Sequence, residues 1–314
     1  MKTKPRFLLI LLLVAMTGPA SLPSLSQEKK KGLEYQLSVS AIAIAVTVQD
    51  KGGRFVNDLA VKDFTVYENN VKQALTYFKH DFDAPLSLTV LLDVSGSMAL
   101  LDRLKESKDG LRYLLTNLLR PQDEISLLIF ADGEVEVAAK FSTDKSAFLA
   151  ELDKTEAYGQ TALNDAVAVS PDFANKGKNE KRAVLLITDG IENDSQSTPD
   201  QAVEIARRVD VPIYTIGYKI PESEQFLSKH KRAANLTPAG IIGTLDKFSQ
   251  ATGGKAFIIN QFGEMKTALV DIKRELSHQY ILGYTSYKPS KNEYRKITVV
   301  TSKKKYKVRT RAGY

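Results

Sequence analysis

The sequence predicts an α/β protein, in which a doubly wound, mostly parallel sheet is inserted in a small β-domain built from both chain ends. From about residue 84 to 278, apolar strand-like runs alternate with amphipathic helical segments. This alternation is typical of a parallel sheet covered on both faces. Short runs rich in β-branched residues lie on either side of that region. Neither flank has enough strands to be stable alone, so together they are expected to form one β-domain. A β-extension packed on the α/β domain is the alternative.

The first 26 residues have the features of a cleaved export signal. Lys2, Lys4 and Arg6 precede the apolar stretch "FLLILLLVAM", and small residues stand before Gln27. The apolar stretch is much shorter than the roughly 20 residues that a membrane span needs. Without cysteine, the chain can form no disulfide, thiolate metal site or lipidated N-terminal cysteine. We therefore expect a secreted or periplasmic protein with no integral membrane span after cleavage.

Residues 33–83 and 279–314 carry the β-domain. The N-terminal part contains the runs "LSVSAIAIAVTVQD", "DFTVYENN" and "VKQALTYFKH", and the C-terminal part contains "QYILGYTSY", "RKITVVTS" and "KYKVRTRAG". From residue 288 onward, the chain contains ten lysines and arginines but a single acidic residue, Glu293. Such a tail can indicate a nucleic-acid or anionic-surface binder. The basic tail is better explained by lysines on exposed edge strands, where they block pairing with other strands. Aromatic residues that could stack on bases are nearly absent. We expect no nucleic-acid partner.

Residues 84–278 form the α/β domain. Strands are expected at residues 87–93, 124–130, 134–141, 182–189, 211–218 and 254–260, and the turn "ADG" predicts a hairpin between the second and third. Helices are expected at residues 102–119, 145–154, 161–170, 199–209, 239–251 and 263–277. One face of the last helix is apolar and should lie against the sheet; it consists of Met265, Ala268, Leu269, Ile272 and Leu276.

Polar side chains follow the first strand of the α/β domain at every second position. Asp93, Ser95 and Ser97 end the run "LSLTVLLDVSGS", and alternate residues of an extended segment project to the same side. In open α/β sheets, ligands bind beyond the carboxyl ends of strands, where the strand order reverses. A carboxylate and two hydroxyls at that position suit a hard cation, since Mg²⁺ takes oxygen ligands and few carboxylates.

Two further oxygen ligands are expected at the same edge. Asp189 ends the strand that should neighbour the first one across the switch point, in "RAVLLITDG". Thr161 lies in the loop before that strand, in "AYGQTALNDA", where Gly159 lets the backbone approach closely. The candidate metal ligands are therefore Asp93, Ser95, Ser97, Thr161 and Asp189.

The motifs "DVSGS", "GQTAL" and "LLITDG" occur in this order and resemble the metal-ion-dependent adhesion site (MIDAS) of the von Willebrand factor type A (VWA) family. The resemblance covers roughly residues 84–278. The flanking segments resemble those of a secreted, acidobacterial-type bacterial subgroup. By this resemblance, Ser95 and Ser97 coordinate the metal directly, and Thr161 does so directly or through water. Asp93 and Asp189 would act largely through water.

The resemblance implies a non-enzymatic, metal-dependent protein-binding or adhesion module. Its Mg²⁺, for which Mn²⁺ or Ca²⁺ could substitute, would accept an Asp or Glu side chain from a protein ligand. A cation held mostly by neutral oxygens keeps enough positive charge to bind such a carboxylate. Integrin β chains bind a second ion through adjacent acids after the serine motif, but this chain has Leu100 and Leu101 there. We therefore expect one metal.

Two other functions stay open from the sequence. The protein could be an exported scaffold or assembly factor that uses the metal site as a clamp. A Mg²⁺-dependent hydrolase is the least favoured function, because the sequence offers no assembled nucleophile and base. A Gly-x-Ser-x-Gly nucleophile elbow is also excluded at the serine motif, since Asp93 occupies the position of its first glycine.

Overall fold

The computed structural model describes residues 38–80, 83–222, 237–288, 293–303 and 305–314. These residues all belong to one compact unit, Leu37–Tyr314. The predicted export signal, residues 1–26, lies outside the described residues. Within the described part of the chain, no helix combines the length and the apolar character needed to cross a membrane.

A six-stranded sheet forms the centre of the α/β domain, with the strand order β10-β9-β8-β5-β6-β7. Every neighbouring pair is parallel except the β6–β7 hairpin. The predicted doubly wound, mostly parallel sheet is confirmed, and β5 lies between β6 and β8 as expected for a switch point. The strands are β5 (Leu86–Asp93), β6 (Glu124–Ala131), β7 (Glu134–Ser142), β8 (Lys181–Thr188), β9 (Ile213–Tyr218) and β10 (Ala256–Ile259).

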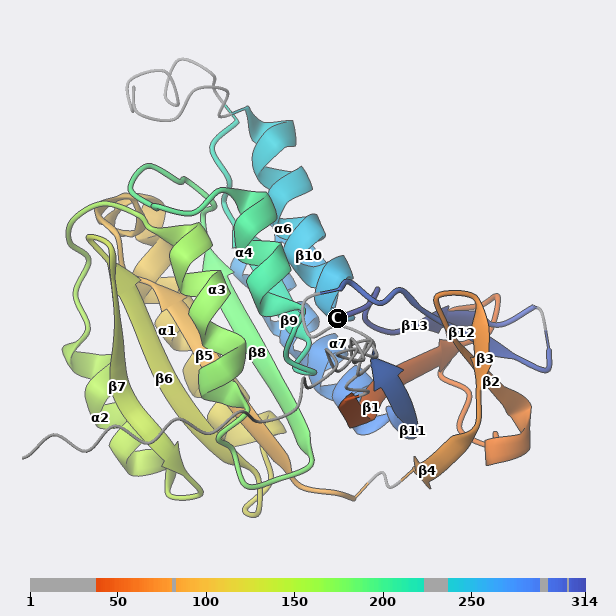
Figure 1. The fold of residues 1–314 in the computed structure, drawn as a ribbon. Helices are drawn as coiled ribbons and strands as arrows, with labels where there is room; N and C mark the ends of the chain where they lie inside the picture. Colours follow the sequence, from red (N-terminus) through yellow and green to blue (C-terminus); the bar gives the residue numbers. More distant parts are fainter. Residues whose placement is uncertain (1–37, 81–82, 223–236, 289–292, 304) are drawn as a thin grey trace, which may run out of the picture. The chain divides into compact units, whose positions relative to one another are not determined.

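Helices cover both faces of this sheet (Figure 1). The helices are α1 (Arg103–Tyr113), α2 (Lys145–Lys154), α3 (Leu163–Ala174), α4 (Pro199–Ala206), α6 (Pro238–Thr252) and α7 (Phe262–Ser277). One buried apolar cluster joins α1, α2 and α7 to the sheet, and a second joins α3, α4 and α6 to its other face. The apolar face predicted for the last helix is confirmed, since all five of its residues are buried.

Local sequence signals explain where several of these helices begin. Thr198 accepts a hydrogen bond from the Gln201 amide at 3.2 Å, and Pro199 is the first residue of α4. Thr237 accepts from the Gly240 amide at 3.0 Å at the start of α6, which also begins with a proline. A hydroxyl cap satisfies an amide that has no partner inside the helix, and proline has no amide hydrogen to lose there.

Two antiparallel sheets combine strands from both ends of the chain, with the orders β13-β1-β11-β4 and β12-β2-β3. Their strands are β1 (Ser38–Gln49), β2 (Phe64–Glu68), β3 (Val71–Gln73), β4 (Leu75–Lys79), β11 (Tyr280–Lys288), β12 (Ile297–Thr301) and β13 (Lys307–Arg309). The pairing of β1 with β11 sets Ala45 opposite Ile281. Residues of both sheets share a third buried apolar cluster. The fold class predicted from the sequence is confirmed, whereas the boundaries between the parts stay predictions.

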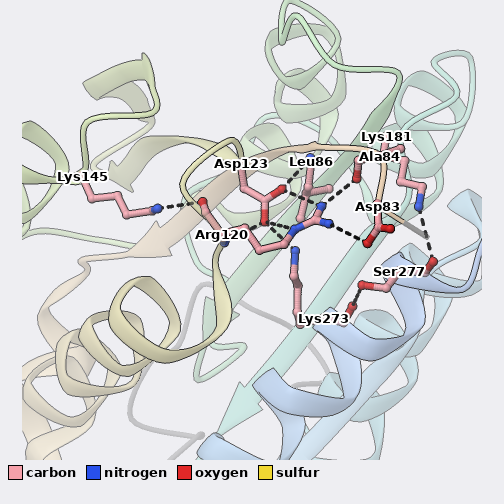
Figure 2. Close-up of polar contacts among 9 residues, drawn as sticks. All are labelled: Asp83, Ala84, Leu86, Arg120, Asp123, Lys145, Lys181, Lys273 and Ser277. Atoms are coloured by element: carbon pink, nitrogen blue, oxygen red, sulfur yellow. Dashed lines mark hydrogen bonds and ion pairs between the residues drawn. The ribbon is translucent and has the colours of Figure 1, made fainter. Parts of the chain in front are cut away.

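A buried carboxylate ties together the amino-terminal edge of the central sheet (Figure 2). Asp123, just before β6, is fully buried. It accepts hydrogen bonds from the Leu86 amide at 2.9 Å, from Arg120 Nη2 at 3.0 Å and from Lys273 Nζ of α7 at 2.6 Å. Burial alone would raise the pKa of Asp123, but the bonds from Arg120 and Lys273 lower that pKa to about 2. Asp123 thus links β5, β6 and α7 as a stable anion.

Candidate metal-binding site

The serine motif forms a compact turn at the carboxyl end of β5. The Ser95 amide donates to Oδ1 of Asp93 at 2.9 Å, and the hydroxyl oxygens of Ser95 and Ser97 lie 3.2 Å apart. Asp93 and Ser95 are buried, and Ser97 is half-buried. The structure therefore brings these three predicted ligands into direct contact at the edge where the sequence places them.

Asp189 follows β8, the neighbouring strand, and is fully buried like Asp93. The last residue of β8, Thr188, donates its hydroxyl to Oδ2 of Asp93 at 2.5 Å. Burial and then the negative charge of Asp189 raise the pKa of Asp93 to about 7. Two buried carboxylates that repel each other form a site in which a cation is strongly favoured.

The loop that carries Thr161 is attached to the serine motif through its backbone. The Gly96 amide donates to the Gly159 carbonyl at 3.0 Å, and the Tyr158 amide donates to the Val94 carbonyl at 2.8 Å. Thr161 is buried, and its loop is the third segment at this edge. Thr161 is thus joined to the other predicted ligands through main-chain bonds beside it.

Gly159 is needed for this close approach. Its φ is +67°, in the left-handed region that favours glycine. A Cβ atom added there would lie 2.2 Å from the carboxylate group of Asp132. The Asp132 carboxylate in turn accepts from the Gln160 amide at 2.6 Å. Glycine at this position lets the Thr161 loop pass beside the β6–β7 turn.

The sequence prediction missed Arg103, the first residue of α1. This side chain is buried, and its Nη1 lies 3.1 Å from Oδ2 of Asp189 and 2.9 Å from the Ser97 carbonyl oxygen. Its Nη2 and Nε donate to the Lys219 carbonyl at 2.7 and 3.1 Å. The only signal for Arg103 in the sequence is its position at the start of the helix that follows the serine motif.

Glu192 and Asn193, which the sequence prediction also missed, hold the loop after Asp189. The Glu192 carboxylate accepts from the amides of Asn164, Asp194 and Ser195 at 2.9–3.0 Å. The Asn193 side chain accepts from the Thr161 amide at 2.7 Å. These bonds join the Thr161 loop to the loop after β8. The run "DGIEND" contains these acids and amides, but nothing in its pattern indicates their partners.

An apolar hollow of about 600 Å³ lies beside the serine motif. Arg103 lines this hollow and also contacts the Ser97 carbonyl. Leu100 and Leu101 line the hollow and are exposed. Leu101 has φ +55° and Asp102 has φ +57°, both in the left-handed region. A bulky non-glycine residue in that region is strained. The residues after the serine motif thus shape an apolar surface at the expense of backbone strain.

The donor chemistry of this edge fits a hard divalent cation. Among the residues that the structure describes, no group of three or more His, Asp or Glu side chains is arranged to hold a metal. The converging groups are two carboxylates, Asp93 and Asp189, and two serine hydroxyls, with Thr161 on the adjoining loop. Such an all-oxygen set with few carboxylates is the kind of site that suits Mg²⁺.

Part of this chain is similar to a known protein family. Residues 88–192 match the von Willebrand factor type A domain family. An uncharacterised protein of Borreliella burgdorferi is 25% identical over 206 residues, covering 61% of this chain and 59% of that protein. The chain thus spans less than two thirds of this relative's length.

Two solved structures are similar to this chain at low sequence identity. A von Willebrand factor type A protein from Catenulispora acidiphila has a TM-score of 0.50 and 15% identity, over 68% of this chain and 50% of that chain. The conserved hypothetical protein BatB from Bacteroides thetaiotaomicron has a TM-score of 0.49 and 16% identity, over 61% of this chain and 98% of that chain. Residues 88–192 are thus similar to the von Willebrand factor type A domain family, and the Catenulispora protein shares the fold.

Proposed function

We propose that the VWA domain is a non-enzymatic, divalent-metal-dependent protein-binding module of the adhesion type. Its Mg²⁺ accepts an Asp or Glu side chain of a protein partner. The metal is held by the side chains of Asp93, Ser95, Ser97, Thr161 and Asp189. Because the sequence predicts a cleaved signal, this module acts outside the cytoplasm.

One observation carries the proposal. The Ser95 and Ser97 hydroxyls lie 3.2 Å apart beside the buried Asp93, and a second buried acid, Asp189, follows the neighbouring strand. The direct ligands would be neutral hydroxyls, with both acids acting largely through water, so the cation keeps a strong attraction for an outside carboxylate. A cation of this kind attracts an outside carboxylate, which is a binding event and requires no catalytic step.

Titration calorimetry of the full chain with Mg²⁺ tests the metal site. The Asp189→Asn variant should lose the heat of binding, because it removes one of two buried carboxylates. In the wild type, Mg²⁺ at 100 times its dissociation constant should add about 2.7 kcal/mol to the free energy of unfolding. Asp189→Asn should gain none of this stability.

Asp194→Asn is the matched control. Asp194 lies in the same loop, five residues further on, but outside the proposed ligand set. It should bind Mg²⁺ like the wild type. Equal Mg²⁺ affinity in the wild type and in Asp189→Asn would contradict the proposal.

A further inference from the structure

Arg103 is a buried cation in contact with one side of the proposed metal site. Its guanidinium contacts the Asp189 carboxylate and the Ser97 carbonyl through Nη1, and the Lys219 carbonyl through Nη2 and Nε. These partners come from the ends of β8 and β9 and from the serine motif. One planar group therefore fixes three segments of the edge at once. Lysine, with a single ammonium, lacks the fork that makes this possible.

The charge of Arg103 bears on what a loaded site can bind. Asp93, Asp189 and Arg103 are all buried, so water screens their charges poorly. With both acids ionised, the three side chains sum to one negative charge. A divalent cation would then leave one net positive charge, which one carboxylate from outside neutralises. Without the arginine, the same loaded site would be neutral before any partner arrives.

We propose that Arg103 is a positioning residue that orients Asp189 and also gives the metal-loaded site its preference for a carboxylate ligand. This inference rests on the proposed function. The positive charge of Arg103 lowers the affinity of the site for the metal cation and raises the affinity of the loaded site for a carboxylate. A residue that only stabilised the fold would not change these two affinities in opposite directions.

Two substitutions separate charge from geometry. Arg103→Lys and Arg103→Gln both lose the guanidinium fork, but only Arg103→Lys keeps the positive charge. We expect Arg103→Gln to bind Mn²⁺ about tenfold more tightly than Arg103→Lys. We expect the Mn²⁺-loaded Arg103→Gln protein to bind a simple carboxylate about tenfold more weakly than Mn²⁺-loaded Arg103→Lys.

Calorimetry with Mn²⁺ alone measures the first affinity in the full chain. The second comes from the paramagnetic relaxation of acetate protons by Mn²⁺-loaded protein, a method suited to weak ligands. Circular dichroism and melting in chelator establish that each variant is folded. If Arg103→Lys does not fold, Arg103→Gln is compared with the wild type. The fork is then lost together with the charge, but only the loss of charge predicts tighter Mn²⁺ binding combined with weaker acetate binding.

Shifts in opposite directions for Mn²⁺ and acetate support the inference. Equal affinities in the two variants, or shifts in the same direction, overturn it while leaving the metal site intact. Absence of Mn²⁺ binding in the wild type overturns the proposed function and this inference together. The two failures are therefore distinguishable.

Discussion

Two fully buried aspartates stand at opposite edges of the central sheet and differ in their neighbours. At the amino-terminal edge, Asp123 is bonded to Arg120 and Lys273, and its pKa is lowered to about 2 (Figure 2). At the carboxyl edge, burial and the charge of Asp189 raise the pKa of Asp93 to about 7. Equal burial thus yields a stable anion at one edge and a repelled acid at the other. The first edge stabilises the fold. At the second, Asp93 and Asp189 repel each other although Arg103 lies beside Asp189, and under the proposed function a bound cation would relieve this repulsion.

Asp123→Asn should have the largest effect on stability. The change leaves Lys273 and Arg120 without their buried counter-charge, so we expect a loss of about 3 kcal/mol. Urea unfolding of the full chain measures this loss. The control is Asp153→Asn, which also removes an ion pair with an arginine, Arg112, but at the surface. Its cost should be below about 1 kcal/mol. A similar loss in the free energy of unfolding for the two variants would mean that the buried ion pairs of Asp123 stabilise the fold no more than a surface ion pair does.

The two aspartates should also respond to pH in opposite directions. The folded-state pKa of Asp123 is below the ordinary value near 4, so its contribution is present above about pH 4 and is lost as the pH falls towards 2. The folded-state pKa of Asp93 is raised, so protonated Asp93 costs nothing at low pH. Stability should therefore be lost as the pH rises from about 4 to 7.

Urea unfolding in chelator at a series of pH values tests this opposition. Asp93→Asn should flatten the loss of stability between about pH 4 and 7. Asp123→Asn should instead flatten the loss at acid pH. An unchanged slope in Asp93→Asn would show that the Asp93–Asp189 pair carries no cost in the folded protein.

The carboxyl edge also carries backbone strain, which gives the smallest predicted effect. Leu101→Asn should raise the free energy of unfolding by about 1 kcal/mol, because asparagine tolerates the left-handed region better than leucine. The control is Leu100→Asn, since Leu100 is also exposed but has an ordinary φ of −83°. Thermal unfolding of both variants measures the difference. Equal changes in the two would mean that the gain comes from removing an exposed leucine.

The sequence predicted the sheet and the location of several candidate ligands for simple physical reasons. The largely apolar runs of β5 and β8 indicate buried strands, and parallel strands carry the residues after them to one edge. Asp93, Ser95, Ser97 and Asp189 were placed at this edge in this way, whereas their binding of a metal stays a prediction. Long-range pairing was not predictable, because nothing local indicates that Arg103 bonds to the Lys219 carbonyl, 116 positions away.

The same limit applies to the acids. Asp93 and Asp123 both stand next to predicted strands, and no local pattern says which has basic neighbours. Lys273 reaches Asp123 across 150 positions, from the helix whose apolar face alone was predicted. The left-handed backbone of Leu101 was equally hidden, because leucine does not ordinarily adopt it.

Anomalous diffraction from crystals of the full chain soaked in Mn²⁺ would show whether the carboxyl edge of the central sheet binds a metal. We expect a single anomalous peak at this edge, within coordinating distance of the Ser95 and Ser97 hydroxyl oxygens. Crystals of Asp189→Asn, soaked in the same way, should lack that peak. A wild-type crystal with no peak there, or with its Mn²⁺ bound elsewhere, would contradict the assignment of this edge as a metal-dependent binding site.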